Sequence, residues 1–202
     1  MLLAINPEHP EPRKIRRAVD FLEKGEVIGY PTDTVYGLGC DIGNKQAVER
    51  LYQIKGMSRD KPLAFICPDL SDIAKYAVVE NQAYRVLKHF LPGPYCFILA
   101  ATRDVPKIVQ TRQKTVGIRV PDHPITLALV RELGRPLIST TAAPPGEDPM
   151  VDPWEIDERF HGLGLVVDGG GGGTIPTTVV DLSQGVVRIV REGAGPVDEL
   201  LV

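Results

Sequence analysis

The sequence predicts a single α/β domain in which helices flank one mixed sheet of parallel and antiparallel strands. Helical and strand patterns alternate along the chain, as is typical of α/β folds. Strand patterns crowd toward the C-terminal end, which favours a mixed sheet over a regular doubly wound one. The chain has 202 residues, 43% hydrophobic and 24% charged, which suits one large domain and excludes a disordered or fibrous protein. We therefore expect one domain spanning residues 1–202.

The N-terminal half begins with an expected helix over Glu11–Lys24. Pro12 stands near its start, an apolar stripe recurs at helical spacing, and Gly25 follows its end. The short apolar run Val27–Tyr30 predicts a buried strand. The same kinds of signal predict, in order, a helix capped by Asn44 and stopped by Gly56, a strand at Leu63–Cys67, helices near 71–77 and 81–90, and a turn at Pro92-Gly-Pro94.

In the C-terminal half the clearest signal is Asp152-Pro153-Trp154-Glu155. It combines a capping aspartate, a first-turn proline and a capping-box glutamate, and so predicts a helix over 153–160. The other expected elements are strands at 95–101 and 115–120, a helix at 124–133, and strands at Leu137–Thr141, Leu163–Val167, Thr178–Leu182 and Val186–Val190, the last two joined as a hairpin. The 20 glycines and 18 prolines predict many shaped turns.

The charges are distributed unevenly along the chain. The formal net charge is −3, but residues 1–143 carry 20 basic and 15 acidic residues, whereas residues 144–202 carry 3 basic and 11 acidic ones. An anionic ligand can therefore find a locally positive surface on a chain that is acidic overall.

The cysteines and the N-terminus indicate the cellular compartment. Cys40, Cys67 and Cys96 have no paired spacing, so we expect neither a disulfide framework nor a zinc site, and a reducing cytoplasm fits best. Residues 1–10 do not read as a signal peptide, and no apolar run approaches the roughly 18 residues of a membrane helix. We expect a cytoplasmic protein with no membrane partner.

Two glycine-rich stretches invite comparison with nucleotide-binding loops. The stretch 37–46 has the wrong glycine spacing for a P-loop, and Gln46 stands where a serine or threonine would bind magnesium. No convincing helix follows the run Gly169–Gly173, so an ordinary loop is favoured over a dinucleotide fingerprint. We assign neither stretch to a nucleotide.

Cations and hydroxyls at expected strand ends are better candidates for a site. Lys55, Arg59 and Lys61 flank a constrained turn, and Arg119 and Arg191 lie at strand ends. Together they can neutralise a polyphosphate, although each alone is more typical of a solvated surface. Hydroxyls that can bind a small polar ligand, but also suit turns and caps, occur in Pro31-Thr-Asp-Thr34, Ser139-Thr-Thr141 and Thr177-Thr178. The four histidines lack ligand spacing, so no metal site is expected.

Longer motifs make a family resemblance specific. The chain resembles the YrdC family of threonylcarbamoyl-adenylate synthases at Tyr30-Pro-Thr-Asp-Thr-Val-Tyr-Gly-Leu-Gly39, Lys55-Gly-Met-Ser-Arg-Asp-Lys-Pro-Leu63 and Val116-Gly-Ile-Arg-Val-Pro121. The resemblance continues through Leu91-Pro-Gly-Pro94, Ser139-Thr-Thr141, Thr177-Thr-Val-Val-Asp181 and Arg191-Glu-Gly193, so it covers nearly the whole chain in order. The opening Ile5-Asn-Pro makes the chain most similar to the YciO branch.

The resemblance implies a fold and a reaction. The implied fold is a twisted, YrdC-like mixed sheet with a large positive concave surface. The implied activity is that of a nucleotidyltransferase that joins L-threonine, bicarbonate and ATP into threonylcarbamoyl-AMP, releases pyrophosphate and serves the threonylcarbamoyl modification of tRNA adenosine. ATP would be a substrate used with Mg²⁺, with no tightly bound cofactor. Such chemistry depends on positioning and electrostatics more than on a dedicated base.

The resemblance also implies roles for individual residues. The positions that match threonine-binding ones are Thr34, Arg119, Ser139 and Thr177, and those that match ATP-binding ones are Lys55, Lys61, Thr115, Thr141 and Arg191. Arg119 suits the threonine carboxylate because a planar guanidinium can pair with it bidentately. Lys55 and Arg59 are the catalytic candidates.

Three positions depart from the family pattern. The lysine-glycine-arginine motif reads Lys55-Gly-Met57, and Arg59 is the candidate replacement for the missing arginine. The serine-x-asparagine pair ends in Thr141, and Ile66 stands where a histidine is usual. These departures leave two other functions open: a non-catalytic protein that binds tRNA or double-stranded RNA in the positive concavity, and an enzyme that hydrolyses or transfers a different carbamoyl compound. A steep salt dependence of RNA affinity would favour the first.

Overall fold

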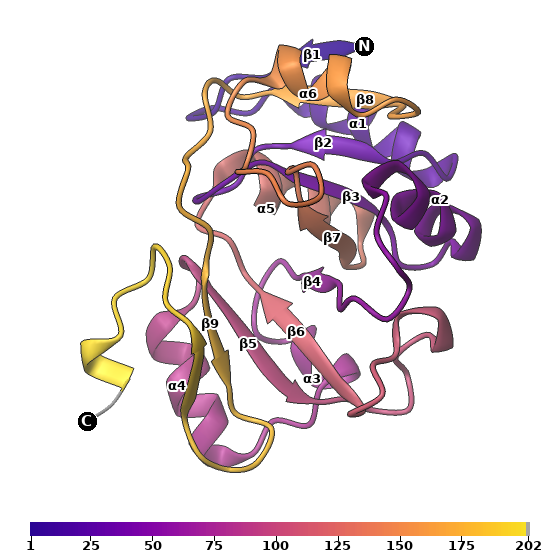
Figure 1. The fold of residues 1–202 in the computed structure, drawn as a ribbon. Coiled ribbons are helices and arrows are strands. Elements are labelled where there is room, and N and C mark those ends of the chain that lie inside the picture. Colours follow the sequence, from indigo (N-terminus) through magenta and orange to yellow (C-terminus); the bar gives the residue numbers. More distant parts are fainter. Residues whose placement is uncertain (201–202) are drawn as a thin grey trace.

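The computed structural model describes residues 1–200, which fold around one ten-stranded mixed sheet (Figure 1). The strands are β1 Leu2–Ala4, β2 Ile28–Tyr30, β3 Gly37–Asp41, β4 Ala64–Ile66, β5 Tyr95–Ala100, β6 Thr115–Arg119, β7 Leu137–Thr141, β8 Leu165–Asp168, β9 Thr178–Asp181 and β10 Arg188–Arg191. The α-helices are α1 Pro12–Glu23, α2 Lys45–Lys55, α3 Ile73–Tyr76, α4 Asn81–Phe90, α5 Pro124–Leu133 and α6 Pro153–Arg159, and short 3₁₀ turns cover Lys107–Val109 and Asp198–Leu200.

The sheet mixes the two pairing directions, as the sequence predicts. Its strand order is β1-β8-β2-β3-β7-β4-β6-β5-β9-β10. The pairs β1–β8, β2–β8, β4–β6 and β5–β9 are parallel, and the remaining five pairs are antiparallel. The expected α/β class, with a twisted mixed sheet flanked by helices, is therefore confirmed.

Local signals account for most helix boundaries. Asn44 caps α2 by accepting a hydrogen bond from the backbone N–H of Ala47 at 3.0 Å, and Gly56 ends the helix at a φ of +64°. Asp152 caps α6 in the same way by accepting from the N–H of Trp154 at 2.8 Å. The apolar stripe of α1 is buried as expected. No helix within residues 1–200 combines the length and hydropathy that membrane crossing requires.

Two strands escape the sequence analysis. β1 has only three residues and pairs with β8, far along the chain. β3 contains Gly37 and Gly39, and glycine weakens strand propensity. The glycines are nevertheless required there, because a Cβ at Gly39 would lie 2.8 Å from the ring of Tyr30 and one at Gly37 would lie 2.9 Å from its hydroxyl. The stretch that resembles a P-loop is thus largely a buried strand.

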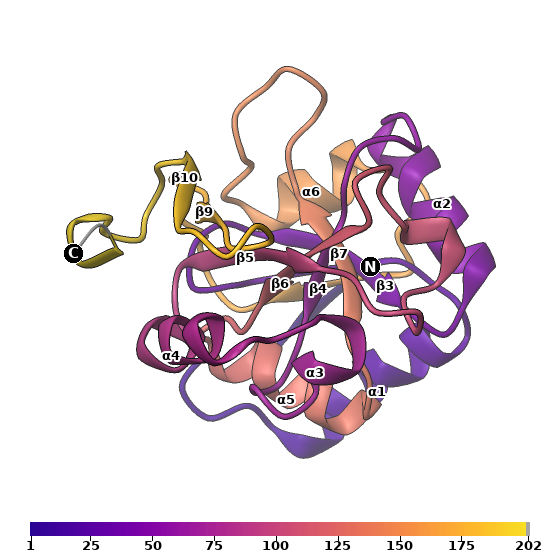
Figure 2. The same cartoon turned by 90° about the horizontal axis from the view of Figure 1, so that it is seen from below.

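The two faces of the sheet are covered differently. One face packs against α2, α6, α3 and α4 through a large apolar cluster, and the other packs against α1 and α5 around β1, β8 and β2 and at Leu137 and Ile66. In Figure 2 the twist of the sheet carries this first face from the upper side, where α2 and α6 lie, to the lower side, where α3 and α4 lie at the β5 end. The helices of the second face do not extend over β6, β5 and β9, and a cavity lies there, bordered by the ends of β7 and β4.

Candidate functional site

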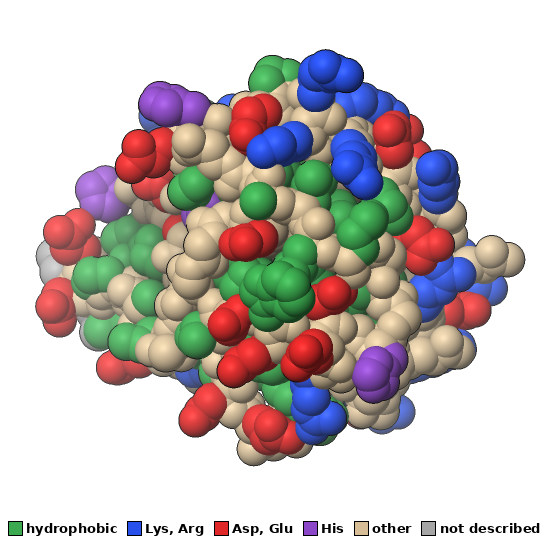
Figure 3. All heavy atoms as spheres, turned by 90° about the horizontal axis from the view of Figure 1, so that it is seen from above, with side chains coloured by type: hydrophobic (Ala, Val, Ile, Leu, Met, Phe, Trp, Pro, Cys, Tyr) green, Lys and Arg blue, Asp and Glu red, His purple; other side chains and the backbone are tan. Residues whose placement is uncertain are grey.

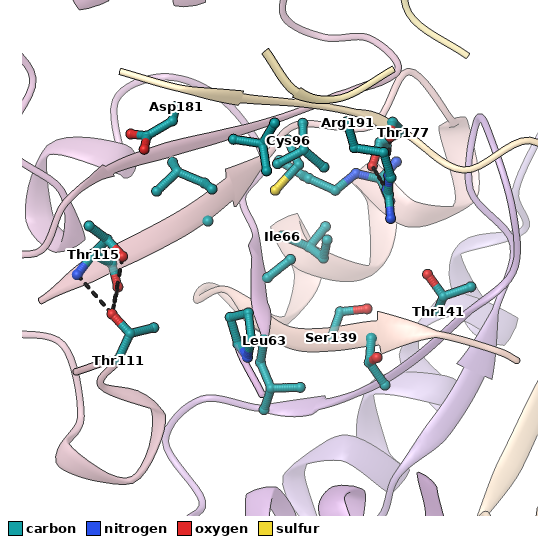
Figure 4. Close-up of a pocket in the computed structure, with 18 of the residues that line it drawn as sticks. Leu63, Ile66, Cys96, Thr111, Thr115, Ser139, Thr141, Thr177, Asp181 and Arg191 are labelled. Atoms are coloured by element: carbon teal, nitrogen blue, oxygen red, sulfur yellow. Dashed lines mark hydrogen bonds between the residues drawn. The ribbon is translucent and has the colours of Figure 1, made fainter. Parts of the chain in front are cut away.

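The cavity on the uncovered sheet face has a volume of about 700 Å³. Side chains alternate along a strand, so every second residue of the floor faces it. On β5, Cys96 and Ile98 line the cavity, whereas Tyr95 and Phe97 are buried on the opposite face. In Figure 4, Ile66 and Cys96 lie in the middle of the pocket, with Thr111, Thr115 and Asp181 on one side and Thr141, Thr177 and Arg191 on the other. The site combines an apolar floor with polar margins.

Arg119, at the end of β6, is the most constrained cation of the site. Only 9% of the residue is exposed. Its Nη2 donates to Asp33 Oδ1 at 2.9 Å and to Thr34 Oγ1 at 3.3 Å, and Asp33 Oδ2 accepts from the N–H of Asp122 at 3.0 Å. Within residues 1–200, Arg119 Nε is buried without a hydrogen-bond partner. Buried donors are normally satisfied, so an anionic ligand oxygen or a water suits this position.

Of the predicted threonine-binding hydroxyls, Thr34 contacts Arg119 and Thr177 contacts Arg191, while Ser139 is held by other groups. Ser139 Oγ donates to Leu38 O at 3.2 Å and is hydrogen-bonded to the hydroxyl of Tyr30. Thr34 Oγ1 lies between Thr32 Oγ1, at 3.2 Å, and Arg119. Thr34 is buried beside Arg119 without lining the cavity, whereas Ser139 lines it directly.

Arg191, at the end of β10, forms a second positive group. Its Nη2 donates to Thr177 O at 2.8 Å and reaches Thr177 Oγ1 at 3.4 Å. Burial raises the pKa of the Cys96 thiol, against the opposing effect of the charges on Arg119 and Arg191. Cys96 therefore lies within the electrostatic reach of both guanidiniums. A ligand with two anionic groups can span this part of the cavity.

The other side of the cavity is polar and contains predicted and unpredicted residues. Thr115 lines it and is held by Thr111, whose Oγ1 accepts from the Thr115 N–H at 2.9 Å. Asp181 and Arg188, which the sequence analysis does not single out, form an ion pair of 2.6 Å on the β9–β10 hairpin. Burial opposes ionisation of Asp181, but hydrogen bonds from Ser183 and Arg188 hold its pKa below the usual value.

The structure does not bring Lys55, Arg59 and Lys61 into the cavity wall. Lys55 Nζ donates to the backbone carbonyls of Thr141, at 2.9 Å, and Ala143. Burial lowers the pKa of Lys55 to about 8. Arg59 has a side chain 69% exposed and lies 4.0 Å from Glu49, and Lys61 is exposed. Asp60 and Pro62 of the same turn do line the cavity, so these cations border it.

The three departures from the family pattern differ in their consequences. Met57 packs against the main apolar cluster. Thr141 lines the cavity, and its carbonyl holds Lys55. Ile66 is fully buried in the floor and pairs in register with Arg119. Only Thr141 and Ile66 therefore change the chemistry of the cavity wall directly.

Asp33 and Tyr30 are the functional residues that sequence reasoning undervalues. Asp33 reads as a turn-capping residue, yet it pairs with Arg119 with only 10% of its side chain exposed. Tyr30 reads as the end of a buried strand, yet its hydroxyl holds Ser139, and burial raises its pKa to about 12. The sequence Thr32-Asp33-Thr34 is the signal that marks Asp33. Both threonines are buried in the structure, and a carboxylate between them requires a partner.

The glycine run 169–173 supports the site through backbone hydrogen bonds. The N–H of Gly173 donates to Thr34 O at 2.9 Å, and the N–H of Gly172 donates to Val151 O at 2.8 Å. A Cβ at Gly173 would lie 2.2 Å from Thr34 O, so only glycine fits this approach. The run therefore ties the turn that carries Asp33 and Thr34 to the loop that follows β7. Across residues 1–200, no three His, Cys, Asp or Glu side chains gather as metal ligands would.

Comparisons with known proteins identify close relatives of the chain. It is 44% identical over 195 residues to an uncharacterized protein of Haemophilus influenzae, with 95% of this chain and 94% of the relative covered. It is 42% identical over 200 residues to the uncharacterized protein YciO of Escherichia coli, with 98% and 97% covered. The crystal structure of E. coli YciO superposes with a TM-score of 0.94 at 40% identity, covering 99% of this chain and 98% of that one.

A more distant relative has a named activity. The threonylcarbamoyl-AMP synthase of Pyrococcus abyssi is 31% identical over 204 residues, which cover 99% of this chain but only 60% of the relative. The crystal structure of P. abyssi Sua5 complexed with L-threonine superposes with a TM-score of 0.92 at 30% identity, covering 99% of this chain and 59% of that one. The model of the Sua5/YciO/YrdC family, described as "Telomere recombination", matches residues 20–193. The chain therefore belongs to the Sua5/YciO/YrdC family.

Proposed function

We propose that the chain is an enzyme of the threonylcarbamoyl-AMP synthase type. The observation that carries this proposal is the buried Arg119, fixed by Asp33 and Thr34, at a cavity that Arg191 also lines. One guanidinium suits the carboxylate of an amino acid, and the other suits a phosphate. The likeness to P. abyssi Sua5, which was crystallised with L-threonine, supports this reading. The product would serve the threonylcarbamoyl modification of tRNA adenosine.

The proposed reaction has two bond-forming steps. The amine of L-threonine takes the carboxyl unit of bicarbonate with loss of water, which gives a carbamate. A carbamate oxygen then bonds to the α-phosphorus of ATP as the bond from that phosphorus to the bridging oxygen breaks, and pyrophosphate leaves with the electron pair. The chain contributes by orienting the amino acid and by offsetting negative charge, which are the main sources of catalysis in such transfers.

Individual residues would divide these tasks. Arg119 binds the amino-acid carboxylate, with Thr34, Ser139 and Thr177 around it. Arg191 offsets charge on the nucleotide phosphates, and Thr115 and Thr141 contact the nucleotide along the cavity wall. Mg²⁺ brought in with ATP would offset further phosphate charge.

The cations of the 55–61 turn require side-chain movement for this function. Lys55, once released from the carbonyls of Thr141 and Ala143, can present its ammonium to the phosphates. Arg59 and Lys61 are long, exposed side chains next to a cavity-lining residue, so ligand phosphates can draw them in at little structural cost. Lys55 and Arg59 thus remain the proposed catalytic cations.

The test is pyrophosphate release by the purified protein with ATP, Mg²⁺ and bicarbonate, with and without an L-amino acid, with products identified by mass. Amino-acid-dependent release of a carbamoyl-adenylate is expected. Arg119→Lys should reduce it by about 100-fold, because a buried bidentate contact is lost. Arg50→Lys is the matched control, since Arg50 makes its contacts with Gly25 and Glu26 away from the cavity. No release with any amino acid would refute the proposal.

Variants that restore the family pattern sharpen the test. Met57→Arg with Thr141→Asn should raise release by about tenfold if the missing phosphate contacts limit the rate. Absence of any gain would mean that the cavity is adapted to another acceptor.

Binding of tRNA or double-stranded RNA without turnover is the competing function. The face seen from above carries acidic side chains around a central hydrophobic group, with basic ones mostly toward the periphery (Figure 3). Trp154, on acidic helix α6, is 64% exposed. Such a face repels a polyanion, so RNA would have to use the cavity side. RNA affinity that falls steeply with salt, together with no pyrophosphate release, would favour this function.

A further inference from the structure

The floor beside Arg119 is apolar, and this bears on which amino acid the cavity accepts. Ile66 of β4 pairs in register with Arg119. Cys96 lies on β5, the other neighbour of β6, one position beyond the pair Phe97–Ile118, and Val179 pairs with Cys96 from β9. All three side chains line the cavity. Arg119 is therefore flanked along one row of the sheet by carbon and sulfur surfaces.

The nearby hydroxyls have their hydrogens directed within the chain. Ser139 Oγ donates to Leu38 O, so the Tyr30 hydroxyl is the donor to Ser139. Thr32 Oγ1 donates to Val35 O at 2.6 Å, so the Thr34 hydroxyl is the donor between these two threonines. Thr177 Oγ1 lies under the Arg191 guanidinium. None of these hydroxyls belongs to the row of Ile66, Cys96 and Val179.

We propose that the amino-acid site accepts a β-branched aliphatic amino acid of the valine class in preference to threonine. This inference rests on the proposed reaction and changes its amino acid, so that the main product would be a valine-derived carbamoyl-adenylate in place of threonylcarbamoyl-AMP. In this proposal the side chain of an amino acid whose carboxylate pairs with Arg119 lies over the apolar row, because Arg119 stands between Ile66 and Cys96 in that row. Valine and threonine have the same shape and differ only in a methyl group and a hydroxyl. A hydroxyl over this row loses its water without gaining a partner, which disfavours it.

The experiment compares L-valine with L-threonine on the intact protein, with no variant required. We expect kcat/KM for amino-acid-dependent pyrophosphate release to be about tenfold to 100-fold higher with valine, the range over which an apolar pocket separates these isosteres. A preference for threonine would overturn the inference and leave the proposed function standing. If neither amino acid supports release, the proposed function fails. The affinities of valine and threonine, measured by calorimetry, then decide the inference: equal or threonine-favouring affinities overturn it, and tighter valine binding supports it.

Two variants test whether the preference for valine over threonine arises from the apolar row of Ile66, Cys96 and Val179. Ile66→Thr keeps a β-branched side chain in the strand and supplies a hydroxyl beside Arg119, so the valine-to-threonine ratio should fall by about tenfold. Cys96→Ser makes the same kind of change with almost no change of shape and should move the ratio in the same direction. Ile98→Thr is the matched control, because Ile98 lines the cavity and pairs with Gly117, away from Arg119. A shift with Ile98→Thr as large as that with Ile66→Thr would overturn the assignment, and thermal unfolding checks that each variant is folded.

Discussion

The Arg119 end of the cavity and the 55–61 turn beside it are both cationic, but they are built differently. Arg119 and Asp33 have side chains only 11% and 10% exposed, and Asp33, itself held by the N–H of Asp122, fixes the guanidinium together with Thr34. Arg59 and Lys61 are exposed, and Lys55 is bound to backbone carbonyls. The first region is organised before any ligand arrives, whereas the second has to be organised by one. Selectivity should therefore reside at Arg119, and charge neutralisation at the turn.

The strongest way to break this comparison is Asp33→Asn. Removing the negative partner leaves Arg119 as an uncompensated buried charge, so we expect a loss of about 3 kcal/mol in the free energy of unfolding. We also expect kcat/KM for the amino acid to fall by about 100-fold, because the guanidinium is no longer aimed. Denaturant unfolding and steady-state kinetics measure the two effects.

Asp20→Asn is the control for Asp33→Asn. Asp20 pairs with Arg16 at 2.8 Å on the exposed face of α1, so its loss should change stability by less than about 1 kcal/mol. Equal effects of the two substitutions would show that the Arg119 end is not preorganised.

Gly173→Ala tests whether the glycine run 169–173 holds the turn that carries Asp33 and Thr34 at the Arg119 end of the cavity. The new Cβ would lie 2.2 Å from Thr34 O, which forces the turn to shift and should cost about 2 kcal/mol of stability. Amino-acid affinity, measured by calorimetry, should fall by about tenfold as Thr34 and Asp33 move. Gly171→Ala is a matched control, because nothing lies within 4 Å of its Cβ position. Similar behaviour of the two variants would remove the glycine run from the site.

The pH dependence of ATP affinity tests whether Lys55, on the 55–61 turn, binds the nucleotide. Burial lowers the pKa of Lys55 from 10.5 to about 8, so its charge is lost as the pH rises through about 8. ATP affinity should therefore fall several-fold between pH 7 and pH 9 in the wild type but not in Lys55→Arg, which stays charged. Between the two pKa values the unfolded chain binds a proton that the folded chain does not, so this group makes the free energy of unfolding rise with pH. A pH-independent ATP affinity would exclude Lys55 from nucleotide binding.

The comparison also separates what the sequence predicts from what it does not. Helices α2 and α6 are predictable because their signals are local. The side chains of Asn44 and Asp152 each accept a hydrogen bond from a backbone N–H two or three positions further along the chain. Strand β3 is not, because its glycines make sense only against the ring of Tyr30 and a long-range pairing with β7.

The candidate site divides in the same way. The family resemblance identifies Arg119, Ser139 and Thr177, all of which line the cavity. It does not reveal that Lys55 is tied to Thr141 and Ala143, since those contacts depend on packing between residues more than 80 positions apart in the sequence. Side chains fixed by strands are thus predictable from motifs, whereas long side chains on turns take their positions from the folded surroundings.

The smallest expected effect concerns Arg59, the candidate replacement for the arginine that Met57 displaces. Its side chain is 69% exposed and 4.0 Å from Glu49, so Arg59→Ala should change the free energy of unfolding by no more than about 0.5 kcal/mol. If ligand phosphates draw Arg59 in, ATP affinity should fall several-fold while amino-acid affinity is unchanged, because only the turn is affected. Arg103→Ala is the matched control, because Arg103 is exposed on a loop whose residues do not line the cavity. An equal loss of ATP affinity in both variants would reflect general surface charge, and no loss in Arg59→Ala would leave the missing arginine unreplaced.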